Sequence, residues 1–229
     1  MTLAEQFGNI DIYVFDQLLR GRIAPGMRVF DAGCGGGRNL VYLLRSGYEV
    51  CGNDADAGAI AQVRALASSL AGGRPQDFRV EPIEQTSFPD QHADVVIASA
   101  VLHFARDEAH FEAMLRQLWR VLKDGGVFFA RLASTIGIAG DVRPLGGPAF
   151  AAEGRYGEVS PKLAPGTPAS GGGRYRLPDG SDRFLVDAAT IEAWTERLGG
   201  VLLDPIKTTV VHEQRAMTTW VARRTVSES

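Results

Sequence analysis

The stretch that decides the fold is Val29-Phe30-Asp31-Ala32-Gly33-Cys34-Gly35-Gly36-Gly37-Arg38-Asn39. Its apolar first residues predict a buried strand that ends at Asp31, and glycines follow at three alternating positions. Glycine adopts positive φ angles and lets the backbone approach a ligand closely. A helix is expected directly after the loop, and the unpaired N–H groups of a helix N-terminus attract anionic groups. The stretch therefore predicts a loop that holds a nucleoside-containing ligand at the edge of a parallel sheet.

Strands and helices alternate regularly on both sides of this loop. A first helix is expected from about Asp11 to Arg20, and Gly21 ends it. The expected strands that follow are 27–32, 48–51, 78–80, 94–99 and 127–132, and the helices between them are 39–46, about 56–70 and 107–122. This alternation predicts a doubly wound α/β fold around a mostly parallel sheet.

The pattern changes after Leu132. Residues 134–183 hold 11 of the 27 glycines and 6 of the 11 prolines. Because this segment leaves the carboxyl end of the fifth strand, where ligands of such sheets bind, we expect it to form a substrate cap. A short strand near 183–186 and a helix after Asp187 follow, and then two strands, about 201–211 and 216–222. The turn between these two is too short for a crossover helix, so they should pair antiparallel.

The sequence thus predicts a single domain, 1–229, with a Gly/Pro-rich insertion at 134–183. We expect a seven-stranded, mostly parallel sheet with an antiparallel C-terminal strand.

The bulk composition is that of an ordinary globular protein, with 45% hydrophobic and 22% charged residues and a formal net charge of -3. This acidity disfavours nucleic acid as a partner, because proteins that bind it usually carry basic patches. Cys34 and Cys51 lie in or beside expected core strands, and no Cys/His cluster has zinc spacing, so we expect buried thiols and no metal. No signal peptide or long apolar run is visible, which predicts a cytoplasmic protein outside membranes. We expect it to be a monomer or a homodimer.

The sixth position of the glycine loop separates two classes of cofactor. A dinucleotide fingerprint has Gly or Ala there, where helix and strand pack. Counted from Gly33, this position is Arg38. The run from Asp31 to Gly37 instead resembles motif I of class I S-adenosylmethionine-dependent methyltransferases. The stretch 94–104 resembles the family's strand-four motif, and 122–126 resembles its L-K-P-G-G turn, with Asp124 in place of Pro. In order and spacing, the resemblance covers residues 27–132.

The resemblance implies a Rossmann-like methyltransferase fold and S-adenosylmethionine as methyl donor, with S-adenosylhomocysteine as product. Asp54, followed by Ala55 at the end of strand two, would accept hydrogen bonds from both ribose hydroxyls. Pro82 stands where the family's adenine-binding acid often lies. Glu84 could serve instead, with the N–H of Ile83 reaching a ring nitrogen, unless Glu84 is simply solvated.

Other residues would meet the methionine end of the donor. Asp31 would orient that end, and Arg38 would pair with its carboxylate unless it is an ordinary surface arginine. The residues that let the chain pass close to the donor would be Gly33, Gly35 and Gly37. Ser99 ends the strand that forms the floor between donor and acceptor.

The acceptor side carries three candidates. His103 follows strand four, and the ordinary imidazole pKa near 6.5 suits a base, although a structural histidine is the alternative. Arg131 and Arg183 could hold an anionic substrate or could form structural ion pairs.

These features predict methyl transfer to a small molecule by in-line displacement, in which the protein mainly supplies positioning. The alternatives are a nicotinamide-dependent oxidoreductase and a non-catalytic S-adenosylmethionine-binding regulatory module. A looser similarity to tellurite-resistance-type methyltransferases covers 37–50 and the C-terminal stretch around His212 and 217–223.

Overall fold

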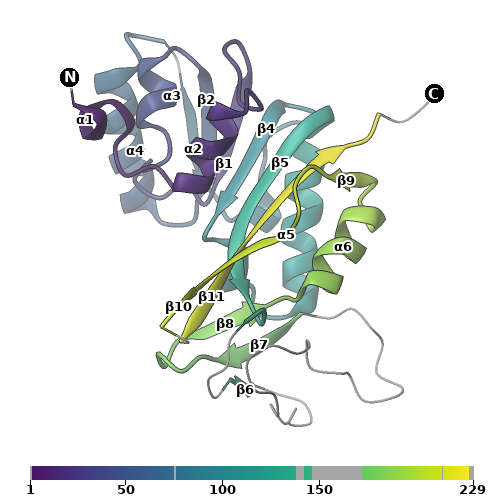
Figure 1. The fold of residues 1–229 in the computed structure, drawn as a ribbon. Coiled ribbons are helices and arrows are strands. Elements are labelled where there is room, and N and C mark those ends of the chain that lie inside the picture. Colours follow the sequence, from purple (N-terminus) through teal and green to yellow (C-terminus); the bar gives the residue numbers. More distant parts are fainter. Residues whose placement is uncertain (1, 75, 138–141, 146–171, 213, 227–229) are drawn as a thin grey trace.

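The computed structural model describes residues 2–74, 76–137, 142–145, 172–212 and 214–226. Its centre is a twisted sheet in the order β10-β11-β5-β4-β1-β2-β3, and β9 pairs with β11 beside this path (Figure 1). The strands are β1 (Arg28–Ala32), β2 (Glu49–Asp54), β3 (Asp77–Val80), β4 (Ala93–Ser99), β5 (Leu122–Ser134), β9 (Gly200–Leu202), β10 (Lys207–Val211) and β11 (Arg215–Arg224). Strands β1 to β5 pair in parallel, and β11 is antiparallel to β5. The predicted doubly wound, mostly parallel fold is confirmed, although the sheet has eight strands within the described residues instead of the expected seven.

Helices cover both faces of the sheet. They are α1 (Leu3–Phe7), α2 (Ile12–Leu19), α3 (Val41–Arg45), α4 (Ala57–Leu70), α5 (Glu108–Val121) and α6 (Ala188–Arg197). Successive side chains of a strand point to opposite faces, so Phe128 packs with α5 and α6 whereas Phe129 packs with α2, α3 and α4. Two buried cores result, one on each face of the sheet.

The predicted strand 201–211 is wrong as a single element. It divides into β9 and β10, which pair with successive parts of β11. Pro205 has no N–H to donate to the ladder, and the neighbouring Asp204 carboxylate is bound by the guanidinium of Arg22 at 2.6 Å. The edge is therefore interrupted there, although the predicted antiparallel pairing holds on both sides of the break.

The described part of the insertion forms a second, small antiparallel sheet, visible beyond the ends of β5 and β11 in Figure 1. Its strands are β6 (Arg143–Pro144), β7 (Gly173–Arg176) and β8 (Asp182–Leu185). A tight turn at 178–180 joins β7 to β8, and the N–H of Leu177 donates to the carbonyl of Ser181 at 2.8 Å. The rest of the expected cap, 138–141 and 146–171, lies outside the described residues.

No helix within the described ranges has the length and apolar character needed to span a bilayer.

Candidate functional site

The glycine loop uses its three alternating glycines in different ways. Gly33, Gly35 and Gly37 have φ angles of 62°, 52° and 85°. A Cβ atom on Gly33 would lie 2.4 Å from the Val101 side chain, and one on Gly37 would lie 2.8 Å from Val63 on α4. A Cβ atom on Gly35 would meet nothing within 4 Å. Two of these glycines therefore permit close packing, and Gly35 borders open space.

The helix after the loop begins later than expected. The sequence predicts a start at Asn39, but α3 begins at Val41. Turn hydrogen bonds intervene, because the N–H of Gly37 donates to the carbonyl of Cys34 at 3.0 Å and that of Leu40 donates to Gly37 at 2.9 Å. The loop itself, rather than a helix N-terminus, thus borders the carboxyl ends of β1 and β2.

Asp54, the last residue of β2, is tied to this loop. One carboxylate oxygen accepts the N–H of Gly35 at 2.9 Å, and the other accepts the N–H of Asp56 at 2.9 Å. Ala55 lies exposed between the two acids, and Asp56 caps α4 as expected. The two backbone hydrogen bonds fix the direction of the Asp54 carboxylate at the sheet edge.

Asp31 is a buried acid with unused hydrogen-bonding capacity. Its side chain is 2% exposed, and within the described residues its Oδ2 atom has no hydrogen-bond partner. Burial raises the pKa of Asp31 to about 7, which the cation of Arg38 partly opposes and the charge of Asp54 reinforces. A buried carboxylate of this kind suits a cationic, hydrogen-bond-donating ligand group.

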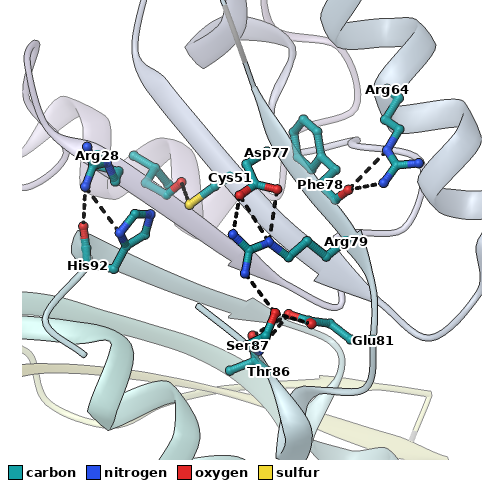
Figure 2. A network of polar contacts seen from close by, with 11 residues as sticks. Arg28, Cys51, Arg64, Asp77, Phe78, Arg79, Glu81, Thr86, Ser87 and His92 are labelled. Carbon is teal, nitrogen blue, oxygen red and sulfur yellow. Dashed lines mark hydrogen bonds and ion pairs between the residues drawn. The ribbon is translucent and has the colours of Figure 1, made fainter. Parts of the chain in front are cut away.

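The segment after β3 engages its acids internally. Figure 2 shows the Glu81 carboxylate accepting hydrogen bonds from Thr86 and Ser87, next to the Arg79–Asp77 ion pair. Glu81 is therefore occupied in shaping this loop.

The 3₁₀ turn η1 (Ile83–Gln85) carries the two adenine candidates. Ile83 is buried, and a Glu84 oxygen lies 3.0 Å from Nε2 of His110 on α5. Burial alone would raise the pKa of Glu84, but a backbone hydrogen bond and the contact with His110 hold it below its usual range. Glu84 is thus partnered by α5 rather than simply solvated.

Arg38 and Arg131, from two distant segments, meet at a residue that the sequence did not single out. Arg38 donates to the Ser99 hydroxyl at 3.1 Å, and the Ser99 hydroxyl donates to the carboxylate of Asp11 at 3.1 Å. Arg131 donates to the same Asp11 oxygen at 3.1 Å. Asp11 lies at the predicted start of a helix, and nothing in its local sequence signals its distant partners.

His103 lies in the 3₁₀ turn η2 (Leu102–Phe104) after β4 and is 6% exposed. The turn follows Ala100, whose φ of 64° is rare for a residue other than glycine and was not anticipated. Nδ1 of His103 accepts the N–H of Ala133 at 3.3 Å, which assigns the proton of the neutral ring to Nε2. Burial, together with the nearby charge of Arg183, lowers the pKa of His103 to about 4. This geometry favours a neutral hydrogen-bond donor over a base that acts near pH 7.

Arg183 reaches the same place from β8. Its guanidinium lies over the Phe104 ring, 4.9 Å from the centroid, and Phe104 is 56% exposed. The structure therefore gathers most predicted site residues at the carboxyl ends of β1, β2, β4 and β5. Glu84 follows β3 and contacts His110 on α5.

Part of the chain is similar to known methyltransferases. Residues 30–130 match the family described as "Methyltransferase domain". An uncharacterised methyltransferase of Synechocystis is 35% identical over 107 residues, which are 46% of this chain and 47% of that protein. A ubiquinone biosynthesis O-methyltransferase of Methylobacterium is 33% identical over 105 residues, covering 46% of this chain and 40% of the relative. The matched region therefore spans less than half the length of these curated relatives.

The fold has counterparts among solved structures. The Burkholderia thailandensis 1,6-didemethyltoxoflavin-N1-methyltransferase, solved with 1,6-didemethyltoxoflavin and S-adenosylhomocysteine, superimposes with a TM-score of 0.66. The alignment covers 96% of this chain and 80% of that one at 15% identity. Residues 30–130 are thus similar to the methyltransferase domain family, and the chain has the fold of this solved methyltransferase.

Proposed function

We propose that the protein transfers a methyl group from S-adenosylmethionine to a small-molecule acceptor. The observation that carries the proposal is the buried Asp31 carboxylate, whose Oδ2 has no partner in the described part of the chain. It lies on the same sheet edge as Gly35, which borders open space, and Asp54, whose carboxylate is fixed by two backbone N–H groups. A cationic, hydroxyl-bearing ligand complements these three features.

Each part of the donor has a matching group on this edge. Asp54 would accept from the ribose hydroxyls, since each carboxylate oxygen has lone pairs beyond the one already used. Asp31 would pair with the donor's ammonium group and Arg38 with its carboxylate. The backbone of Ile83 and the carboxylate of Glu84, one oxygen of which contacts His110, would meet the adenine. The donor, when bound, supplies an activated methyl group with its own leaving group.

The chain's own contribution would be positioning. In-line displacement needs the two reacting atoms held roughly 3–3.5 Å apart and requires no covalent protein residue. His103 would orient the acceptor through its Nε2 proton, because a pKa of about 4 leaves it neutral and weakly basic at pH 7.

The acceptor surface would be formed by Phe104 and Arg183. An exposed aromatic ring with a guanidinium stacked on it suits a small planar molecule that carries an anionic group. The names of the relatives support a small-molecule acceptor: one acts in ubiquinone biosynthesis, and the Burkholderia enzyme was solved with a small heterocycle. The insertion 134–183, which carries Arg183, would cover the acceptor.

Methyl transfer from a labelled donor tests the proposal. The chain would be incubated with methyl-labelled S-adenosylmethionine and a panel of small phenols, heterocycles and aromatic acids. We expect label in at least one of them, and Asp54→Ala should weaken donor binding several-fold to about a hundredfold. Tight donor binding without transfer to any compound would favour a binding module over an enzyme.

A further inference from the structure

The carboxylate of Asp11 does more than cap α2. One oxygen accepts the N–H of Tyr13 at 3.0 Å, which is the ordinary role of an N-cap residue. The side chain is nevertheless only 1% exposed, and the partners of its second oxygen lie outside α2. That oxygen accepts from the Ser99 hydroxyl and from Arg131, both at 3.1 Å, and lies 3.6 Å from Nη2 of Arg38.

These partners come from three different parts of the sheet edge. Arg38 follows the glycine loop, Ser99 ends β4, and Arg131 is its register partner on β5. The N–H of Asp11 also donates to Asn39 at 3.0 Å, so the main chain of Asp11 is fixed to the glycine loop as well. One residue of the N-terminal segment thereby joins three segments of the candidate donor site.

Charge explains why this position needs an acid. Two guanidinium groups converge on one point, and without a carboxylate between them they would repel one another. A buried carboxylate in turn needs cationic or hydrogen-bonding partners, which this one has. Arg38 contacts this cluster through Nη2, and half of its side chain remains exposed toward solvent.

We propose that Asp11 is a positioning residue of the donor site. Directly and through Ser99, it holds the guanidinium of Arg38 beside the glycine loop, in the orientation that receives the carboxylate of the donor's methionine moiety. The inference rests on the proposed function, because it assumes that this donor binds at this edge. It adds a residue outside the motifs and makes correct docking of α2 a condition for tight donor binding.

Calorimetric titration with two ligands tests this role. S-adenosylhomocysteine carries the amino-acid moiety, whereas 5′-methylthioadenosine has the same adenosine and thioether but lacks the carboxylate. Asp11→Asn keeps an oxygen for the Tyr13 N–H and removes the negative charge. We expect Asp11→Asn to weaken the binding of S-adenosylhomocysteine about tenfold or more, and the binding of 5′-methylthioadenosine by less than twofold.

Matched variants separate positioning from folding. Asp187→Asn changes the N-cap of α6, whose carboxylate accepts the Thr190 N–H at 2.7 Å away from this cluster, and should leave both affinities unchanged. Arg38→Gln should mimic Asp11→Asn, and the double variant should be little worse than either single one. Ser99→Ala, which removes only the bridging hydroxyl, provides the same comparison if Asp11→Asn does not fold.

The outcomes distinguish the two claims. Equal weakening of both ligands, or no weakening by Asp11→Asn, would overturn the positioning role and leave the proposed function intact. A wild-type chain that binds neither ligand would overturn both.

Discussion

Asp31 is the buried acid of the proposed donor site. Its pKa is about 7 in the folded chain against an ordinary value of 3.8, because burial disfavours the charged form. Between these two pH values the folded chain keeps a proton that the unfolded chain releases. The free energy of unfolding therefore falls as the pH rises, by up to about 1.4 kcal/mol per pH unit, and the loss is complete above pH 7.

Asp31→Asn should reveal this cost. We expect the variant to have a higher free energy of unfolding than the wild type at pH 8 without ligand, and a similar one near pH 4. It should bind S-adenosylhomocysteine more weakly, and its affinity should lack the increase between pH 6 and 8 that ionisation of Asp31 gives the wild type. Urea unfolding and calorimetry measure the two effects. A variant that is no more stable at pH 8 and binds as tightly as the wild type would contradict the role given to Asp31.

His103 gives a second prediction at this scale. Its pKa is lowered to about 4 by burial and by Arg183, so its contribution to stability is present above pH 6.5 and is lost as the pH falls through 4. His103→Asn, whose amide oxygen can still accept the Ala133 N–H, should be less sensitive to acid in this range. Turnover should fall while donor affinity stays within about twofold. If the pH–rate profile of the wild type showed a His103-dependent limb near 6.5, the residue would be a base and this interpretation would be wrong.

At the scale of elements, the glycine loop separates stability from binding. Gly37→Ala combines a positive φ with a collision against Val63 on α4, and should lower the free energy of unfolding by more than about 2 kcal/mol. Gly35→Ala also places a side chain at a positive φ but meets no neighbour, so the free energy of unfolding should fall by only about 1 kcal/mol. Its new methyl group would project into the proposed donor site, and it should weaken the binding of S-adenosylhomocysteine at least about tenfold.

Gly72→Ala is the matched control for Gly35→Ala. Gly72 has a φ of 60°, and a Cβ atom there would also meet nothing within 4 Å, but Gly72 follows α4 and is not part of the glycine loop. It should lose similar stability and keep donor affinity. If Gly35→Ala bound as tightly as Gly72→Ala, the open space at Gly35 would not belong to the donor site.

Local sequence predicted the elements best where pattern and turn residues agree. The β–α alternation gave the parallel strands, and Asp56 and Asp187 marked the helix starts correctly. The predicted bounds of two elements were wrong, because contacts formed only in the folded chain fix where these elements end or begin. The break between β9 and β10 falls at Pro205 and at the ion pair of Asp204 with the distant Arg22, and the late start of α3 accompanies turn hydrogen bonds within the glycine loop.

At the scale of the whole molecule, the motifs of the proposed donor site could be predicted from the sequence because each is a contiguous stretch at the end of a strand. The role of Asp11 could not be predicted in this way, because the partners of its carboxylate, Ser99 and Arg131, lie 88 and 120 positions away in the sequence. Only the folded sheet brings them together. The lowered pKa of His103 could not be predicted either, since the nearby charge of Arg183 belongs to the insertion, far along the sequence.

Direct binding of the donor tests the central claim. We predict that calorimetry of the wild-type chain with S-adenosylmethionine or S-adenosylhomocysteine shows one site per chain that Asp54→Ala weakens, and that NAD produces no binding heat. Tight binding of NAD without binding of either sulfur nucleoside would contradict the account.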